Sequence, residues 1–264
     1  MTRARFRRRS VVVSVEHASA RVPRELGDLG LDPRWLRGHH AWDPGAATAG
    51  RLLAWAFDAP LHLGHVSRLV VDLNRSANHP RVVPRTLRPE DVAIPANAGL
   101  DRAGRRARLE RYWRPWREAV EADMDAAVTR CGVVLHVSVH SFTPQIAPDV
   151  PPRDNDFALM YWPSLPHERA LADRLAARLE AAGYRVRRNW PYAGHDDGFC
   201  MRMRHERDPE HYVGMEFEMN QRTCATPAGA RRLALALRAA LEPEIAPGRR
   251  SGARRDRVAR RQPR

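Results

Sequence analysis

Short runs of apolar and β-branched residues alternate along the chain with longer segments whose apolar residues recur at helical spacing. Runs of the first kind predict strands at residues 10–15, 61–65, 69–73, 133–140, 157–161, 184–188 and 212–219. Segments of the second kind predict helices at residues 46–57, 102–129, 167–182 and 226–241, with a short helix from residue 33 and a kink at Pro115. Because strands that alternate with helices are typical of parallel sheets covered on both faces, we expect an α/β fold with a mainly parallel sheet.

The stretch VVLHVSVHSFTP, residues 133–144, has a polar face that a plain core strand does not need. At the two-residue period of a strand, His136, Ser138 and His140 share one face, while valines share the other. A strand of this kind presents His140 to the loop that follows it. We expect His140 to serve a site and His136 to have a structural or supporting role.

Polar residues also gather at the ends of the other predicted strands. In parallel sheets, ligands bind at the carboxyl ends of the strands, so these residues are expected to converge although they are far apart in sequence. They are His17 after residues 10–15, Arg68 with Asn74 and Arg75 around residues 69–73, His140, and Glu216 with Glu218 on residues 212–219.

The formal net charge of +14 is concentrated at the two ends of the chain. Residues 1–9 carry a charge of +5 and residues 249–264 a charge of +7, which leaves the interior nearly neutral. We therefore expect a single domain at residues 10–243, with basic disordered tails at residues 1–9 and 244–264. A nucleic-acid-binding protein that acts through these tails is the alternative from a different functional class.

Residue types that are rare or missing exclude several kinds of chemistry. The chain has no lysine, which excludes Schiff-base chemistry, and its three cysteines form no CxxC pair. The cysteine content is typical of a reducing cytoplasm. We find neither a signal peptide nor an apolar segment long enough to span a membrane, so a membrane partner is not expected. The oligomeric state cannot be predicted from these features.

Two histidines and a carboxylate make up a common catalytic zinc site, in which an open position holds an activated water. His17 and His140 are the best nitrogen ligands, and Asp43 is the preferred oxygen ligand ahead of Glu16. Asp43 could instead cap the helix at residues 46–57. A further carboxylate must accept a proton from the water, and Glu218 has a suitable position on its strand, although Glu216 lies on the same face.

Six motifs in this order resemble the N-formylglutamate amidohydrolase family over residues 11–222. They are VEHAS, HHAWDPGA, SRLVVDLNRS, VSVHSFTP, NWPYAG and VGMEFEMNQ. A more distant similarity runs to zinc carboxypeptidases and aspartoacylases. The resemblance implies a three-layer α/β/α fold of the zinc-exopeptidase kind with a mixed, mainly parallel sheet.

The resemblance also implies a role for each candidate residue. His17 and His140 would bind Zn²⁺ or another divalent metal, Glu218 would be the general base, and Arg68 would stabilise the oxyanion. Asn74 and Arg75 would hold a substrate carboxylate, with Ser141 and Tyr192 as further substrate contacts. The third metal ligand departs from the HxxE pattern of the carboxypeptidases because Ala20 stands at that position, so it must come from elsewhere, and the WDPGA motif with Asp43 is its natural supplier.

The implied activity is hydrolysis of N-formyl-L-glutamate to formate and glutamate, as part of amino-acid catabolism such as histidine degradation. Another small N-acyl amino acid or small peptide could be the substrate on the same scaffold. A family member that has lost its metal and its activity is a third alternative, although every expected residue type is present.

Overall fold

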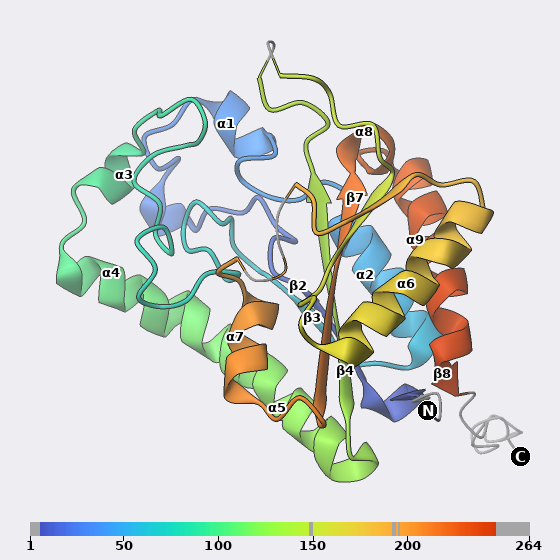
Figure 1. The fold of residues 1–264 in the computed structure, drawn as a ribbon. Coiled ribbons are helices and arrows are strands. Elements are labelled where there is room, and N and C mark those ends of the chain that lie inside the picture. The colour runs from blue at the N-terminus through green and yellow to red at the C-terminus, as the bar shows by residue number, and fades with distance from the viewer. Residues whose placement is uncertain (1–5, 148–149, 192–193, 195, 247–264) are drawn as a thin grey trace, which may run out of the picture.

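A six-stranded sheet with the strand order β3-β2-β4-β7-β5-β6 forms the centre of the protein (Figure 1). The computed structural model describes residues 6–147, 150–191, 194 and 196–246. Neighbouring strands are parallel except β5, which runs antiparallel to β7. The sheet is therefore mixed and mainly parallel, as the sequence predicts. Its strands are β2 (Val11–Val15), β3 (Leu61–Leu63), β4 (Val134–Phe142), β5 (Phe157–Met160), β6 (Val186–Arg188) and β7 (Tyr212–Asn220).

Helices cover both faces of this sheet, which gives three α/β/α layers (Figure 1). One layer contains α2 (Ala46–Phe57), α6 (Pro166–Ala181) and α9 (Pro227–Leu241), and the other contains α5 (Arg114–Cys131) and α7 (Phe199–Glu206). Alternation along the strands separates the two cores, because Val11 and Val13 face the first layer while Val12 faces the second. The short helices are α1 (Pro33–Arg37), α3 (Pro95–Ala98), α4 (Arg102–Arg108) and α8 (Gln221–Cys224).

Residues 69–73, predicted as a strand, form turns instead. The amide of Val70 bonds to the carbonyl of Ser67, and the amide of Asp72 bonds to the carbonyl of Val82. Val70 and Val71 are fully buried in the second core. The apolar run is thus explained by packing beneath the helical layer, because a buried turn needs apolar side chains as much as a strand does.

The helix predicted at residues 102–129 consists of three pieces. A π-helical turn, η3 (Leu109–Trp113), separates α4 from α5, and Pro115 lies in the first turn of α5. The helical backbone is continuous from α4 through η3 into α5, so Pro115 removes an amide donor from within this helix, directly after the π-helical turn. Helix α7 was not predicted, since residues 196–207 lack a clean apolar period.

The two ends of the described chain meet beside the sheet. Strand β1 (Phe6–Arg7) pairs in parallel with β8 (Ile245–Ala246), next to the 3-10 turns Arg8–Ser10 and Glu242–Glu244. The domain boundaries predicted at residues 10 and 243 therefore move outward, because Phe6 and Ile245 are buried in the core. The rest of the predicted tails, residues 1–5 and 247–264, lies outside the described residues.

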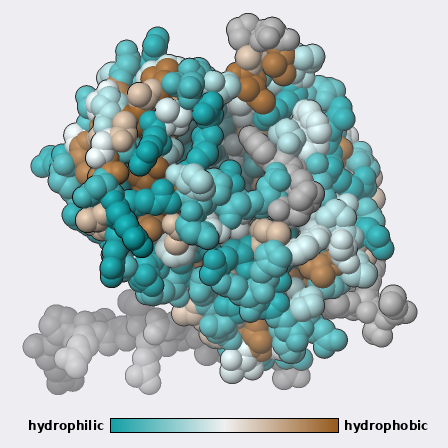
Figure 2. Space-filling model, turned by 60° about the vertical axis from the view of Figure 1, so that its left-hand side comes forward, coloured by the Kyte–Doolittle hydropathy of each residue, from teal (hydrophilic) through white to brown (hydrophobic). Residues whose placement is uncertain are grey.

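The face shown in Figure 2 is mainly hydrophilic, with apolar side chains in small separate groups. Among the described residues, no helix is both long enough and apolar enough to cross a membrane.

Candidate active site

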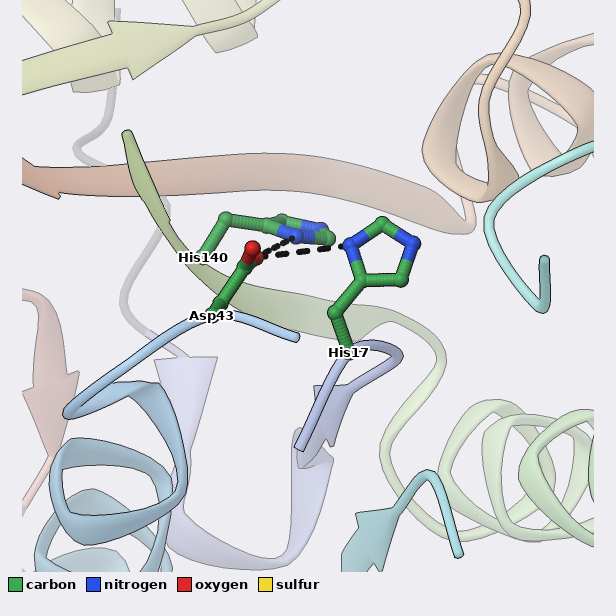
Figure 3. Close-up of side chains that lie close together, drawn as sticks. All are labelled: His17, Asp43 and His140. Carbon is green, nitrogen blue, oxygen red and sulfur yellow. Dashed lines mark hydrogen bonds and ion pairs between the residues drawn. The ribbon is translucent and has the colours of Figure 1, made fainter. Parts of the chain in front are cut away.

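Three side chains from separate segments converge at the carboxyl end of the sheet. His17 follows β2, Asp43 lies in the loop before α2, and His140 lies near the end of β4 (Figure 3). All three residues are buried, and their potential ligand atoms lie within 4.8 Å of one another. The structure thus brings together the three residues predicted to bind a metal.

Each histidine turns its Nδ1 atom towards Asp43. Asp43 Oδ2 lies 3.4 Å from His17 Nδ1 and 3.0 Å from His140 Nδ1. The opposite ring nitrogens contact other carboxylates: His17 Nε2 lies 2.7 Å from Asp72 Oδ1, and His140 Nε2 lies 3.1 Å from Glu16 Oε2. Such outward contacts fix ring orientation and leave Nδ1 for a metal, as is common around histidine ligands.

Glu16, the alternative third ligand, faces away from the Nδ1 atoms. Ser14 and Ser138 donate hydrogen bonds to its two carboxylate oxygens at 2.6 and 2.9 Å, and His140 Nε2 lies beside it. The geometry therefore favours Asp43 as the oxygen ligand and makes Glu16 the partner of His140. His136 lies deeper, between Ser14 Oγ at 2.7 Å and the Tyr212 hydroxyl at 2.8 Å.

Asp43 does not cap helix α2, whose first residue follows Gly45. Gly45 has a φ of 84°, and a Cβ atom there would lie 2.2 Å from the carbonyl oxygen of Cys224. Only glycine therefore suits this tight turn. The Ser141 hydroxyl donates to the carbonyl of Pro44 at 2.9 Å, so the end of β4 holds the turn that carries Asp43.

Burial and neighbouring charges shift the pKa values of the two histidines in opposite directions. Burial and the charge of Arg68 lower the pKa of His17 to about 4. Burial alone would lower the pKa of His140, but the hydrogen bond and negative charge of Glu16 raise it to about 9. Conversely, burial would raise the pKa of Glu16, but His140 holds it well below its usual range. The chain without metal therefore favours a His140–Glu16 ion pair.

Glu218 and Glu216 project from β7 towards the same site but have different partners. In the register of β4 and β7, Glu218 lies opposite His140. Burial raises the pKa of Glu218, and its Oε2 atom is buried without a hydrogen-bond partner among the described residues. Glu216 instead lies 3.6 Å from the guanidinium of Arg204. The unpartnered Glu218 carboxylate is thus the better candidate to exchange a proton.

The three predicted anion-binding residues each have a partner within the protein. Arg68 forms an ion pair with Asp43. The guanidinium of Arg75 donates to the carbonyl of Asp197 and lies 4.0 Å from Asp72 Oδ2. The side-chain oxygen of Asn74 accepts a hydrogen bond from the amide of Phe199 at 2.7 Å.

The three candidate metal ligands, the two glutamates of β7 and the three anion-binding residues line one cavity of about 490 Å³. Its wall includes His17, His140 and Glu218 from the ends of strands and Arg68 and Arg75 from the turns that follow β3. The chemistry of the donor set fits a divalent metal ion, because two neutral imidazoles and a carboxylate are preferred zinc ligands. The buried, unpartnered Glu218 oxygen fits a base that faces the same space.

The sequence pattern did not predict several residues that hold the site in place. Asp72 and Asp197 hold His17 and Arg75, and buried Arg117 donates to the carbonyls of Leu73 and Arg75. Asp72 has a local signal because it stands two residues before Asn74, whereas nothing in the sequence connects Arg117 with this turn. Tyr192, a predicted substrate contact, lies outside the described residues.

Comparisons with known proteins identify the family and the fold of the chain. The profile of the N-formylglutamate amidohydrolase family matches residues 9–225. The solved structure of a gene product from Agrobacterium tumefaciens is 32% identical, with a TM-score of 0.77 over 89% of this chain and 90% of that chain. An N-formylglutamate amidohydrolase from Ralstonia eutropha JMP134 shares the fold at 22% identity, with a TM-score of 0.68 over 89% and 93% of the two chains. No curated protein gives a significant match.

Proposed function

The chain belongs to the N-formylglutamate amidohydrolase family and is thus a hydrolase of amide bonds, and we propose that it is a zinc-dependent enzyme that cleaves N-formyl-L-glutamate to formate and L-glutamate. The observation that carries this proposal is the buried group of His17, Asp43 and His140, which faces the unpartnered carboxylate of Glu218 in one cavity. The Ralstonia protein that shares the fold carries the name of this activity.

His17, Asp43 and His140 would hold the metal through Nδ1, a carboxylate oxygen and Nδ1. A bound divalent ion lowers the pKa of a water molecule and polarises the substrate carbonyl. The role of the metal in this chain is supported by the orientation of the two imidazoles, whose other nitrogens are held by Asp72 and Glu16. Zinc is proposed over other divalent ions because of the two histidine ligands.

Glu218 accepts the proton of the attacking water and delivers it to the departing amine nitrogen. Burial supports this role because it raises the carboxyl pKa towards the range in which a group can both accept and release a proton. Arg68 stabilises the negative charge that develops on the carbonyl oxygen. Ser141 is proposed to position Asp43, since its hydroxyl donates to Pro44.

Arg75 and Asn74 hold the carboxylate of the amino-acid part of the substrate. A planar guanidinium can form two parallel hydrogen bonds with a carboxylate, which favours acidic substrates. The amide nitrogen of Asn74 is available to add a donor, because its side-chain oxygen already accepts from Phe199. Tyr192 is proposed as a further contact with the substrate.

The cellular setting is also part of the proposal. The free thiols of Cys131, Cys200 and Cys224 support a reducing cytoplasm as the site of action. The proposed substrate supports a role in amino-acid catabolism.

The test combines metal analysis with a substrate panel. We expect purified protein to contain zinc and to release formate from N-formyl-L-glutamate, and we expect chelation to abolish and zinc to restore this activity. Release of another acyl group from a different N-acyl amino acid would reassign the substrate on the same scaffold. Protein without metal and without activity on any member of the panel would overturn the proposal.

The role of Glu218 has a separate test. The Glu218→Gln variant should lose activity by about 10²- to 10⁴-fold in kcat, the range typical of a lost general base, while its metal content stays unchanged. The matched Glu216→Gln variant removes a carboxylate that already faces Arg204, and its kcat should fall less than that of Glu218→Gln. The reverse order of the two losses would transfer the role of base to Glu216.

A further inference from the structure

A chain of buried polar side chains runs from the candidate metal group into the interior of the sheet. Its first links are the contact of His140 Nε2 with Glu16 at 3.1 Å and that of Glu16 with the Ser14 hydroxyl at 2.6 Å. The Ser14 oxygen lies 2.7 Å from His136 Nε2, and His136 Nδ1 lies 2.8 Å from the hydroxyl of Tyr212. Each of the five residues is at most 4% exposed, so every hydrogen bond of the chain is made within the protein.

Three neighbouring strands supply this chain, and a glycine leaves room for its last member. Ser14 comes from β2, His136 from β4 and Tyr212 from β7. In the register of β4 and β7, Gly214 lies opposite His136. A Cβ atom at Gly214 would lie 2.8 Å from the Tyr212 hydroxyl. The glycine therefore allows a tyrosine two residues away to reach His136 with its hydroxyl.

The hydrogens of the chain point one way, towards Glu16. The hydroxyl of Ser14 has one hydrogen and donates it to Glu16, so its oxygen accepts from His136 Nε2. Burial lowers the pKa of His136 to about 3, so its ring is neutral and carries one hydrogen, on Nε2. His136 Nδ1 is then an acceptor for the Tyr212 hydroxyl, and the Cys200 thiol lies 3.4 Å from the same atom.

The other oxygen of Glu16 is held by the same kind of contact. Ser138 donates its hydrogen to Glu16 Oε2 at 2.9 Å, and its oxygen lies 3.0 Å from His140 Nε2. His140 Nε2 thus faces two acceptors, which keeps a hydrogen on that nitrogen and leaves Nδ1 for a metal. Each oxygen of Glu16 accepts from one serine, so the direction of each hydroxyl affects how Glu16 holds His140.

We propose that Tyr212 and His136 are positioning residues for His140, which act through this one-way chain. The hydroxyl of Tyr212 fixes the tautomer of His136, and that tautomer turns the Ser14 hydrogen towards Glu16. If the hydrogen of His136 moved to Nδ1, Nε2 would become an acceptor, and Ser14 would donate to it instead of to Glu16. Glu16 would then hold the Nε2 hydrogen of His140 less firmly. This inference rests on the proposed metal site.

The first test measures the tautomer of His136 from the NMR shifts of its ring nitrogens in the metal-free, full-length protein. In the wild type we expect the hydrogen on Nε2. In the Tyr212→Phe variant we expect the form with the hydrogen on Nδ1 to become populated, because Nδ1 has lost its donor. A wild-type His136 with its hydrogen on Nδ1 would overturn the proposal, and that measurement needs neither a variant nor a metal. An unchanged tautomer in Tyr212→Phe would overturn the role of Tyr212.

The second test measures zinc affinity by chelator competition above a pH of about 9, where no proton competes with the metal for His140 Nδ1. Burial raises the pKa of Tyr212 well above its usual value, so its hydroxyl keeps its hydrogen there. Tyr212→Phe should weaken zinc binding about 2- to 10-fold, the effect of one hydrogen bond, and no more than Ser14→Ala does. In the variant with both changes, the loss should equal that of Ser14→Ala alone, because the chain is already cut at Ser14.

Tyr112→Phe is the matched control, because it removes a tyrosine hydroxyl that donates at 3.0 Å to Glu25, outside the chain. It should leave zinc affinity unchanged. Losses that add in the double variant would show a general structural effect of Tyr212 and overturn the proposal, as would equal affinities of wild-type protein and Tyr212→Phe. These outcomes leave the amidohydrolase proposal intact. Absence of zinc binding by the wild-type protein would overturn the proposed metal site and, with it, this role of the chain.

Discussion

Each histidine of the candidate metal group is positioned by a carboxylate on the far side of its ring. Asp72 lies beside His17, and Glu16 lies beside His140, so both Nδ1 atoms point to Asp43. A carboxylate in this position fixes the tautomer and makes the imidazole a better donor to a metal. In the proposed metal site, we therefore expect Glu16 to strengthen metal binding without being a ligand itself.

Above a pH of about 9, where His140 carries no proton in either protein, replacement of Glu16 by glutamine should weaken metal binding about 10- to 100-fold, as is typical when such a partner of a ligand is removed. The reason is that a neutral amide holds His140 less strongly than a carboxylate does. The measurement is competition for zinc with a chromophoric chelator. Ser14→Ala, which removes only one hydrogen bond to Glu16, should have a smaller effect. Equal affinities of wild-type protein and the glutamine variant would contradict this role.

Metal affinity should rise with pH up to about 9, because Glu16 raises the pKa of His140 to about 9 in the chain without metal. The sign follows from the raised value: below it, His140 carries a proton that a metal must displace from Nδ1, and above it the proton is already lost. At neutral pH, zinc binding should release protons into the buffer. Isothermal titration calorimetry in buffers with different ionisation enthalpies measures this release. If the number of protons released on zinc binding does not decline as the pH approaches 9, His140 is not the group that loses the proton.

At the scale of elements, helix α5 and the π-helical turn before it hold the turn that presents Arg75. Trp113 Nε1 donates to the carbonyl of Arg75 at 2.9 Å, and Arg117 Nε donates to the carbonyl of Leu73 at 3.1 Å. The sequence pattern assigns the aromatic residues of this segment to packing alone. A π-helical turn shifts the following side chains around the helix axis, and such turns are frequent at functional sites.

Trp113→Phe should raise KM for all N-acyl amino acids by about 2- to 10-fold, the effect of one lost hydrogen bond, with little change in kcat. Steady-state kinetics with at least two substrates measures KM and kcat separately. Trp116→Phe is a matched control because Trp116 Nε1 has no hydrogen-bond partner among the described residues. If the two variants have the same KM, the hydrogen bond from Trp113 does not position Arg75.

At the scale of the whole molecule, the two ends of the described chain close the fold through the β1–β8 pair. Most of the net positive charge lies in residues 1–5 and 247–264, which are outside the described residues. The nucleic-acid alternative depends on those residues, and neither the family nor the shared fold supports it.

Removal of residues 1–5 and 249–264 should leave kcat/KM and zinc content unchanged, because the site and the β1–β8 pair remain. Further removal of Phe6 and Arg7 should lower the thermal midpoint, since it deletes buried Phe6. Activity assays and thermal unfolding on the two truncated proteins measure these effects. Loss of activity in the shorter truncation would show that the tails take part in catalysis.

The sequence by itself determined the class of fold and the residue types of the site. A strand repeats every two residues, so the alternation in residues 133–142 and 212–219 places His140 and Glu218 on single faces whatever surrounds them. Glycine at position 45 reflects a local backbone requirement in the same way. The six motifs, in their order along the chain, indicated the family, which neither the charge nor the composition indicated.

Only the tertiary structure decided which carboxylate faces which ring nitrogen. Asp43 and Glu16 are both near histidines in sequence, but only the packing of the loop before α2 against β4 turns Asp43 towards Nδ1 and leaves Glu16 behind the ring. The buried run at residues 69–73 misled the strand prediction because apolarity reports burial rather than backbone geometry. The partners of Arg75 depend on contacts between distant segments, and a local pattern carries no information about these.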